Sequence, residues 1–563
     1  MFLDPRLRLP LAFAAGVATA LGFAPTDFWI LAILGTAMLV GLVDTAPSRR
    51  NAAATGWVWG FAMFATSLTW IATAFTFQSA MPAAMGWVAV LGLSAFLALY
   101  PMIASVAARA LPQPGLARLL VLAGAFMITE WLRGVLFSGF SWNPLGVAWL
   151  ASPGIAQLAR DIGAQGLSGL MVIAGGGLWL LLGPQRTLTQ RGVGVAIAAF
   201  MLLSGLIGRT YIQNVYFPDN PTLVIVQPNI GQDEKYDEGA NARHLERYLA
   251  ITREAVADST MGGAVEEERS DQQAAAPFAG VDENAERSGG DQNPPEQEVG
   301  STISETLAGA DLAERPNLVI WSESAVFGLP EEDPALRRKL ATVLRPRDLL
   351  LFGGVAAERD AAGNIDKLRN SLFVLDASAR ILARYDKAHL TPLGEYVPAR
   401  GIMETIGLAR LAPGGIDFAP GPGPKTFSLP GIPPFSAMIC YEIIFGGRVT
   451  EYGQRPAWIV NISNDAWFGP TGPPQHLAQA RLRSIEEGLP LARATPTGIS
   501  AVIGPSGGIF AQQDAGISGF IRTTLPPPLP ATPYAIYGDQ IPLGLSGLLL
   551  ISGVVLWRRR TVL

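Results

Sequence analysis

The segment from residue 51 to residue 108 contains no charged side chain. Roughly 20 apolar residues cross a bilayer, so a run of this length is too long for a single membrane helix. It is interrupted near residues 78–82, which divides it into two expected spans. In the whole chain only 15% of residues are charged and the mean hydropathy is +0.30, whereas globular proteins have about 25% charged residues. We therefore expect a polytopic membrane protein.

Eight segments have the apolarity and length of membrane-spanning helices. We place them near residues 9–24, 28–44, 55–76, 83–107, 117–137, 167–184, 192–209 and 540–557. The stretch between the last two of these eight segments differs in composition from the segments themselves. We therefore divide the chain into a seven-helix transmembrane domain (1–210), an extramembrane domain (211–538) and a C-terminal transmembrane helix with a basic tail (539–563).

Basic residues alternate along the chain as the positive-inside rule describes. The short loops near 24–27 and 78–82 have no Lys or Arg. The opposite segments carry Arg6, Arg8, Arg49, Arg50, Arg109, Arg118, Arg186, Arg191, Arg558, Arg559 and Arg560. Both termini are therefore expected in the cytoplasm, with the extramembrane domain on the far side. Residues 1–25 also fit a cleaved signal peptide, but its removal would put Arg49 and Arg50 on the wrong side.

The charge balance and the metal-binding residue types limit the classes of function. A net charge of −5 does not favour nucleic-acid binding. Cys440 is the only cysteine, which excludes an internal disulfide framework and a multi-cysteine metal site. The three histidines, His244, His389 and His476, do not favour a histidine-rich metal site. We expect no metal, no cofactor and no nucleic-acid partner.

A charge pair, Glu130 and Arg133, lies at the outer end of the fifth expected span, before the stretch 137–142. Charged residues at a membrane boundary usually reach the interface or serve the structure. We favour that interpretation. The alternative is that this segment shapes an access route for a lipid head group.

The extramembrane segment mixes strand and helix patterns. Strands are predicted at 222–227, 317–321, 349–355, 371–376, 380–385, 435–440, 457–462 and 498–504, and helices at 242–257, 332–344 and 474–487. This mixture, with some strands joined as hairpins, indicates an α/β layered domain. Residues 258–315 are polar and acidic without an apolar period, so we expect a disordered insertion that acts as a solvated spacer.

Cys440 ends the apolar run 435–439 and precedes a segment that could open a helix. A thiol at such a turn would meet the positive end of the helix dipole, which lowers its pKa and favours nucleophilic attack. The backbone N–H of Tyr441 would then help to bind an oxyanion. Without this context, a lone cysteine is more often a small buried apolar residue.

Two further stretches at strand ends carry candidate chemistry. Glu323 follows the apolar run 317–320 and is a candidate general base. Lys387 lies in a stretch rich in turn formers, where it could stabilise an oxyanion, and Glu395 could orient the lysine or move protons. Taken singly, each is more often a surface charge. The three contexts together favour a catalytic set.

Glu323, Lys387 and Cys440 stand in the order of the catalytic Glu, Lys and Cys of the nitrilase superfamily, which the chain resembles. Further motifs make almost the whole chain similar to the bacterial apolipoprotein N-acyltransferase family. They lie at residues 23–25, 227–230, 387–398, 440–442, 461–469, 475–478, 481–490 and 497–504.

The resemblance implies eight spans and an extracytoplasmic nitrilase-like α-β-β-α sandwich. It also implies acyl transfer from a membrane phospholipid, through a Cys440 thioester, to the α-amino group of a lipoprotein's diacylglyceryl-cysteine. Glu323 would be the base, and Lys387 and the Tyr441 N–H would stabilise the oxyanion. Glu395 and Glu442 match acidic positions of the family. Tyr236 stands where the family often has tryptophan, which leaves the detailed role of that position open.

The same resemblance places the protein in the bacterial inner membrane with its catalytic domain on the periplasmic face. Large apolar loop residues could line an acyl-chain path, although core packing is the better interpretation of each: Phe327, Leu329, Leu393, Trp467 and Phe468. Two other functions compete. One is a membrane-tethered amidase or nitrilase, which would not need seven preceding spans. The other is a transporter or scaffold, and the near absence of ionisable residues within the spans argues against a proton or ion path.

Overall fold

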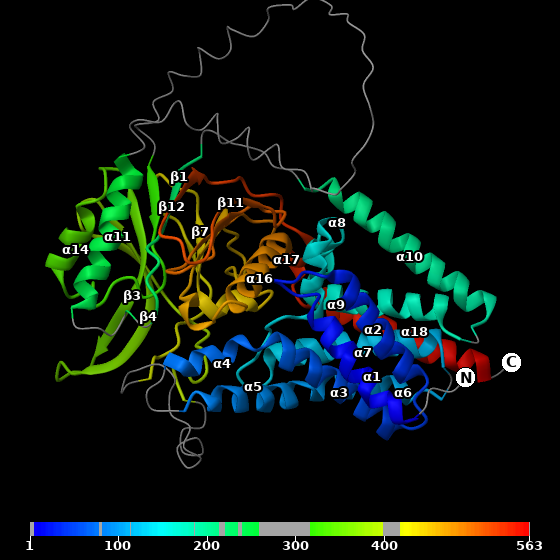
Figure 1. The fold of residues 1–563 in the computed structure, drawn as a ribbon. Coiled ribbons are helices and arrows are strands. Elements are labelled where there is room, and N and C mark those ends of the chain that lie inside the picture. The colour runs from blue at the N-terminus through cyan, green and yellow to red at the C-terminus, as the bar shows by residue number, and fades with distance from the viewer. Residues whose placement is uncertain are drawn as a thin grey trace, which may run out of the picture.

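The computed structural model describes residues 5–77, 82–112, 114–184, 186–212, 220–232, 234, 239–257, 316–397 and 417–561. The expected insertion at 258–315 and Tyr236 lie outside these residues. Figure 1 shows a region of long helices, to which both ends of the chain contribute, beside a region of strands flanked by helices.

Within the described residues, eight helical segments occupy the positions of the expected spans. Four are long and apolar enough to cross a bilayer, namely Ala84–Arg109, Ala159–Leu182, Leu188–Arg209 and Gln540–Arg559, and a fifth is formed if Arg49–Ser67 and Trp70–Phe77 are one span bent by 47°. The count of eight crossings stays a prediction. The segments are α1 (Arg8–Ala20), α2 (Trp29–Asp44), α3 (Arg49–Ser67) with α4 (Trp70–Ala74), α5 (Ala84–Leu97) with α6 (Leu99–Arg109), α7 (Leu116–Val135), α9 (Ala159–Leu182), α10 (Leu188–Arg209) and α18 (Gln540–Thr561).

Helix α9 begins earlier than the expected span at 167–184. Its first turn is interrupted at Gly163, whose φ of +64° is a conformation that favours glycine. A Cβ atom there would lie 2.2 Å from the ring of Tyr534, in helix α17 (Pro533–Tyr537). Glycine therefore lets the end of the extramembrane segment pack closely on α9.

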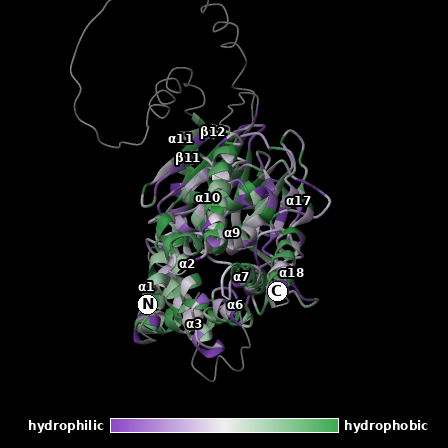
Figure 2. Ribbon diagram, turned by 90° about the vertical axis from the view of Figure 1, so that its right-hand side faces the viewer, coloured by the Kyte–Doolittle hydropathy of each residue, from purple (hydrophilic) through white to green (hydrophobic). Residues whose placement is uncertain are grey.

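The outer helices expose large apolar side chains. Leu188, Leu202 and Ile207 on α10 are at least half exposed, as are Leu548 and Ile551 on α18. Figure 2 shows hydrophobic residues along the helices of this region. Apolar surface of this extent marks contact with a membrane or another protein, and here it lies on helices long enough to span a bilayer. The protein is membrane-embedded.

The strands form two six-stranded sheets, with the orders β12-β1-β2-β3-β4-β5 and β11-β10-β9-β8-β7-β6. Parallel pairs occupy the centres (β1–β2–β3 and β7–β8–β9), and antiparallel strands lie at the edges. The strands are β1 (Thr222–Gln227), β2 (Asn317–Ile320), β3 (Leu349–Arg359), β4 (Ile365–Asp376), β5 (Ile381–Asp386), β6 (Thr426–Phe427), β7 (Phe435–Ile439), β8 (Trp458–Ile462), β9 (Leu491–Ala494), β10 (Ser500–Ile503), β11 (Ile509–Gln513) and β12 (Gly519–Thr524).

All eight predicted strands are present, and the structure adds β6, β9, β11 and β12. The sequence of β9 is Leu-Ala-Arg-Ala, which has no β-branched residue, and only its central place in the sheet makes it a strand. β11 and β12 are partly exposed edge strands with mixed polar sequences. Apolar periodicity is weak in all three, so pairing rather than pattern defines them.

Alternation along the strands builds four layers. In β1, Val224 and Val226 pack in one apolar cluster with Leu249 of helix α11 (Ala240–Ala257). Leu223 and Ile225 belong instead to the cluster that contains β7 and β8. Helices α11 and α14 (Pro334–Ala341) cover one sheet, and α16 (Gly472–Glu487) covers the other (Figure 1). This is the expected α-β-β-α sandwich.

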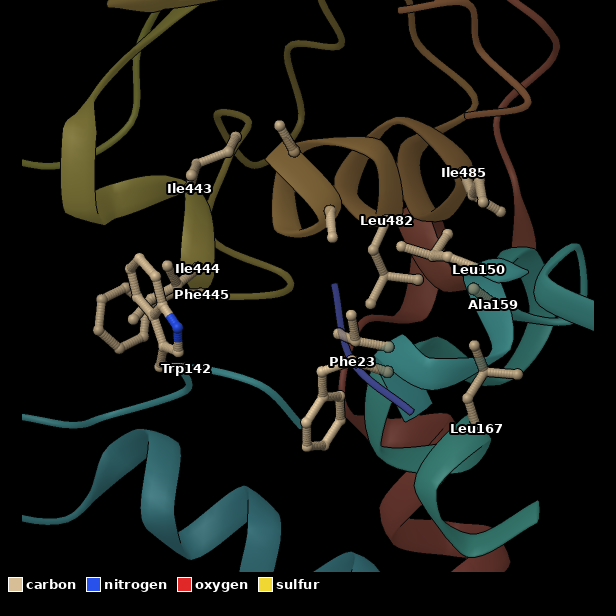
Figure 3. Close-up of a cluster of buried hydrophobic side chains, with 14 of the residues drawn as sticks. Phe23, Trp142, Leu150, Ala159, Leu167, Ile443, Ile444, Phe445, Leu482 and Ile485 are labelled. Atoms are coloured by element: carbon tan, nitrogen blue, oxygen red, sulfur yellow. The ribbon is translucent and has the colours of Figure 1, made fainter. Parts of the chain in front are cut away.

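The sandwich and the helical region share one continuous apolar core. Helix α16 and the short 3₁₀ helix η7 (Cys440–Ile444) contribute the sandwich side of this contact. We call it the domain joint, and Figure 3 shows it. Its labelled residues are Phe23, Trp142, Leu150, Ala159 and Leu167 from the helical region, with Ile443, Ile444, Phe445, Leu482 and Ile485 from the sandwich.

The Glu130–Arg133 pair is buried beside this joint, with 3.6 Å between Arg133 Nη2 and Glu130 Oε1. Arg133 donates to the carbonyl oxygens of Phe140 and Trp142, and Glu130 accepts from the N–H of Leu145. These bonds shape the loop that follows α7, which supports the structural interpretation of the pair.

Candidate active site

Three strand ends bring Glu323, Lys387 and Cys440 together. Glu323 follows β2, Lys387 follows β5, and Cys440 follows β7, which belongs to the other sheet. The side chains are 5%, 2% and 6% exposed, and Lys387 Nζ lies 3.4 Å from Glu323 Oε1. The thiol of Cys440 interacts electrostatically with both charges. The three residues singled out in the sequence therefore form one buried cluster.

Glu395 completes this cluster, because its Oε2 lies 2.9 Å from Lys387 Nζ. The Asn370 side-chain amide donates to Glu323 Oε1 and to Glu395 Oε1, at 2.7 Å in both cases. The N–H of Thr391 donates to the remaining oxygen of Glu395, and the N–H of Asn464 donates to that of Glu323. Both carboxylates are thus fixed in place by backbone and amide donors.

The ammonium group of Lys387 lies close to two carboxyl groups, those of Glu323 and Glu395. Burial lowers the pKa of Lys387, but Glu395 and Glu323 outweigh burial and leave that pKa raised. Burial raises the pKa of Glu395, but Lys387, Asn370 and Thr391 outweigh it and leave that pKa lowered. Lys387 and Glu395 therefore stay charged.

Cys440 sits on a strained turn between β7 and η7, with a φ of +52°. The sequence led us to expect a lowered thiol pKa, and this expectation is wrong. Burial raises the pKa of Cys440, Glu323 raises it further, and Lys387 opposes them incompletely. The helix that follows is a five-residue 3₁₀ helix in a buried site, too short to offset desolvation. The resting thiol is protonated and needs a base.

Glu442 is held by four hydrogen-bond donors outside the Glu323–Lys387–Glu395 cluster. Its Oε1 accepts from the N–H groups of Ala388 and His389 and from the Tyr385 hydroxyl, and its Oε2 accepts from the N–H of Ile439. Burial raises its pKa, against these bonds. One carboxyl group thus joins the loop of Cys440 to the loop of Lys387.

Tyr441 links the cysteine turn to the helical region. Its hydroxyl donates to the carbonyl oxygen of Gly139 at 3.0 Å, in the loop after α7. His389 Nε2 lies 2.7 Å from the neighbouring carbonyl oxygen of Ser138. Because a carbonyl only accepts, this nitrogen carries the proton. The residues around the thiol are therefore held by both parts of the molecule.

A second buried polar group lies behind the cysteine turn. His476 Nε2 is 3.2 Å from the carbonyl oxygen of Cys440, and His476 Nδ1 is 3.0 Å from Asp465 Oδ1. Arg493 pairs with Asp465 and with the side chain of Asn461. Burial raises the pKa of Asp465, but Arg493 and His476 outweigh it and leave that pKa strongly lowered.

No local sequence pattern singles out Asn370, Asn464 or this second group. Asn370 is an amide beside the apolar half of β4, and only the pairing of β4 with β5 brings it next to Lys387. Asp465 and His476 lie in stretches that carry the family resemblance, and that resemblance was the available signal.

Sequence models of two protein families match the chain. The apolipoprotein N-acyltransferase N-terminal domain matches residues 15–177, and carbon-nitrogen hydrolase matches residues 225–529, which include Glu323, Lys387 and Cys440. An apolipoprotein N-acyltransferase of Rhodopseudomonas palustris is 33% identical over 98% of this chain and 95% of its own length. The chain belongs to the apolipoprotein N-acyltransferase family.

Other relatives agree. The apolipoprotein N-acyltransferase of Bradyrhizobium diazoefficiens is 33% identical, over 99% of this chain and 95% of that protein. A solved amidase of the nitrilase superfamily from Nesterenkonia AN1 is more distant, at 18% identity over 40% of this chain and 83% of that one, with a TM-score of 0.26. Family membership rests on the two family models and the two apolipoprotein N-acyltransferases, and not on this amidase.

As a family member, the chain is an acyltransferase with a carbon-nitrogen hydrolase domain. This agrees with the resemblance seen in the sequence. It favours acyl transfer over the two competing functions, a membrane-tethered hydrolase and a transporter or scaffold, because the match extends through the helical region as well as the sandwich.

The apolar residues considered for an acyl-chain path divide into two groups. Phe468 packs between Trp70 and Trp142, with ring centroids 4.6 and 5.5 Å away. Trp467 contacts Phe77 at 5.8 Å. These two are packed against other rings, whereas Phe327 is 37% exposed.

Across the described ranges, no group of three or more His, Cys, Asp or Glu side chains could hold a metal ion.

Proposed function

We propose that this protein transfers an acyl chain from a membrane phospholipid to the free α-amino group of a lipoprotein's N-terminal S-diacylglyceryl-cysteine. Membership of the apolipoprotein N-acyltransferase family supports the acceptor. The observation that carries the proposal is the buried convergence of Glu323, Lys387 and Cys440, in a sandwich packed against membrane helices.

In the first half-reaction, Glu323 takes the proton of Cys440 as sulfur attacks the ester carbonyl of the phospholipid. Lys387 and the N–H of Tyr441 stabilise the oxyanion of the tetrahedral intermediate. The carbon–oxygen bond then breaks, and Glu323 returns the proton to the departing lysophospholipid alkoxide. The products are a Cys440 thioester and a lysophospholipid. The raised pKa of Cys440 agrees with proton removal during attack rather than before it.

In the second half-reaction, the neutral α-amino group of the lipoprotein attacks the thioester. Glu323 takes a proton from the attacking nitrogen, the same oxyanion site is used again, and the carbon–sulfur bond breaks. The thiolate of Cys440 recovers the proton from Glu323. Two half-reactions through one covalent intermediate predict ping-pong kinetics.

The supporting residues would act through the three reacting groups. Glu395 holds Lys387 charged and in place, and Glu442 and Tyr441 fix the turn that presents Cys440. Tyr236, outside the described residues, would supply an aromatic platform in place of the tryptophan that the family often has at this position.

For the membrane arrangement we propose eight spans in the bacterial inner membrane, with cytoplasmic termini and the catalytic domain on the periplasmic face. The division is a transmembrane domain at 1–210, a catalytic domain at 211–538 and a C-terminal helix at 539–563. The support is the alternation of basic residues and the apolar outer helices.

The test is to incubate purified protein with phospholipid carrying a labelled acyl chain, and then to add a diacylated lipopeptide. We expect a hydroxylamine-labile label on Cys440 that moves to the peptide amine. If wild-type protein forms no thioester, the proposal fails. Release of the label only as free fatty acid would favour the competing hydrolase.

A further inference from the structure

Behind the cysteine turn, His476 is fully buried and its Nε2 lies 3.2 Å from the carbonyl oxygen of Cys440. A carbonyl oxygen can only accept, so Nε2 carries the proton and donates it. The ring has no room to turn, because Trp142 and Phe468 lie against it with centroids 5.1 and 5.6 Å away. His476 is therefore a fixed donor to one particular peptide group.

That peptide group joins Cys440 to Tyr441. In a planar trans peptide the C=O and the N–H point in opposite directions. A donor that holds the Cys440 carbonyl on the α16 side therefore directs the N–H of Tyr441 to the other side. This is the N–H that would bind the oxyanion in the proposed reaction.

The other side of the imidazole is also fixed. Nδ1 lies 3.0 Å from Asp465 Oδ1 and 3.0 Å from an Nη atom of Arg493. Asp465 also accepts from the Ser463 hydroxyl at 2.6 Å. All of these side chains are at most 1% exposed. A histidine held from both sides, with no exposed edge, cannot reach substrate and can act only through the backbone that it contacts.

We infer that His476 is a positioning residue for the oxyanion site. By donating to the Cys440 carbonyl oxygen, it orients the N–H of Tyr441 toward the substrate carbonyl oxygen that becomes the oxyanion. Asp465 and Arg493 hold the imidazole in the required orientation. This inference rests on the proposed function, since it concerns the same acylation step. It predicts that His476 matters for reactions of Cys440 that form an oxyanion and not for those that form none.

Two reactions of the same thiol separate these cases. Acylation by phospholipid passes through a tetrahedral oxyanion, whereas alkylation by iodoacetamide is a direct displacement at carbon without one. Both need Glu323 and an accessible Cys440. The ratio of the two rates therefore reports on the oxyanion site alone.

The experiment measures both rates for wild type, His476→Leu and His476→Gln, with thermal unfolding as a check of folding. His476→Leu should acylate about 10²-fold more slowly, as on loss of one oxyanion donor. Its alkylation rate should stay within about threefold of wild type, since alkylation has no oxyanion to stabilise. Gln places its amide Nε2 at the position of the imidazole Nε2, so His476→Gln should recover most of the acylation rate.

The inference is overturned if acylation and alkylation fall together, which would mean a purely structural role, or if acylation does not change. Should His476→Leu not fold, His476→Asn repeats the test, because its shorter amide corresponds to Nδ1 and cannot reach the Cys440 carbonyl. Failure of the proposed function is distinguishable, because wild type itself would then form no acyl-enzyme.

Discussion

Two buried carboxyl groups, Glu395 in the active site and Glu486 at the domain joint, have pKa values that are shifted in opposite directions. Glu395 accepts bonds from Asn370, the N–H of Thr391 and Lys387, and its pKa is lowered in spite of burial. Glu486 is also paired with a cation, Arg483, at 3.0 Å. Burial nevertheless raises the pKa of Glu486 to about 7.

The difference lies in the neighbouring groups and not in burial. Glu487 and Asp539 also raise the pKa of Glu486. Glu486 accepts from the N–H of Ala164 and from Arg483, but its Oε2 has no hydrogen bond within the described structure. Both oxygens of Glu395 are bonded, one of them to a backbone N–H. An interior carboxylate thus stays charged when donors surround it, and a single ion pair does not suffice. The active site meets this condition, and the joint does not.

The largest expected effect removes the nucleophile that the charged cluster serves. Cys440→Ser should lower turnover on the order of 10⁴-fold or more, because a serine hydroxyl is a far weaker nucleophile at neutral pH. The measurement is transfer of a labelled acyl chain to a diacylated lipopeptide. Substantial turnover by this variant would remove Cys440 from the mechanism.

The second prediction compares one carboxyl group from each region. Glu323→Gln should reduce acylation of Cys440 by about 10²–10⁴-fold, since the amide cannot take the thiol proton. The matched variant Glu486→Gln, also buried and isosteric, should leave the acylation rate within a few-fold of wild type. Equal losses in single-turnover acylation would mean that Glu323 is not the base.

The third prediction reverses the donor that the two active-site carboxylates share. Asn370→Asp replaces the amide between Glu323 and Glu395 with a third carboxyl group, so turnover should fall about 10- to 100-fold, as expected for losing bonds to charged groups. Activity should partly recover at lower pH, where the new carboxyl group is protonated. Asn220→Asp is the control, because Asn220 donates to the carbonyl oxygen of Leu525 and not to the cluster. A flat pH response would contradict this account.

The smallest effect concerns Glu486 and stability. Its carboxyl pKa rises from 4.5 to about 7 on folding, so its contribution to stability is complete below pH 4.5 and is lost as pH rises through 7. The unfolding temperature of the purified protein should therefore fall between pH 5 and pH 8. In domains of about 150–250 residues, each kcal/mol of lost stability lowers this temperature by about 2–4 °C. Glu486→Gln should reduce this slope, and part of it should stay because burial also raises the pKa of Glu487 to about 7. An unchanged slope would show that other groups cause it.

The sequence predicts much of the fold because its signals are local. The apolar runs of β1, β2, β7 and β8 mark buried strands by composition alone, and the charge-free run 51–108 does the same for part of the membrane region. β9 carries no such mark, because its strand character comes from its neighbours in the sheet.

For the candidate site, the sequence indicates the residues that we propose to react, but few of the residues that hold them in place. Glu323, Lys387 and Cys440 each end a recognisable strand. Asn370 is 47 residues from Glu323 and 25 residues from Glu395 in the chain, and His476 is 36 residues from Cys440. No local pattern reveals contacts over such separations. The thiol pKa was also beyond the sequence, because it depends on how completely the folded chain removes water from Cys440.

The domain joint has a consequence for the lipid environment. Ile443, Ile444 and Phe445 follow Cys440 after two residues and pack into the same core as the helices of the membrane region, so the position of the cysteine turn relative to those helices is fixed. In the proposed reaction, with phospholipid as acyl donor, the thickness of the surrounding bilayer would then set the distance between Cys440 and the ester bonds of the phospholipids. A thicker or thinner bilayer shifts how helices sit in it, at a cost of fractions of a kcal/mol per Å. Lipid chain length is therefore a control on acylation that leaves every residue of the active site unchanged.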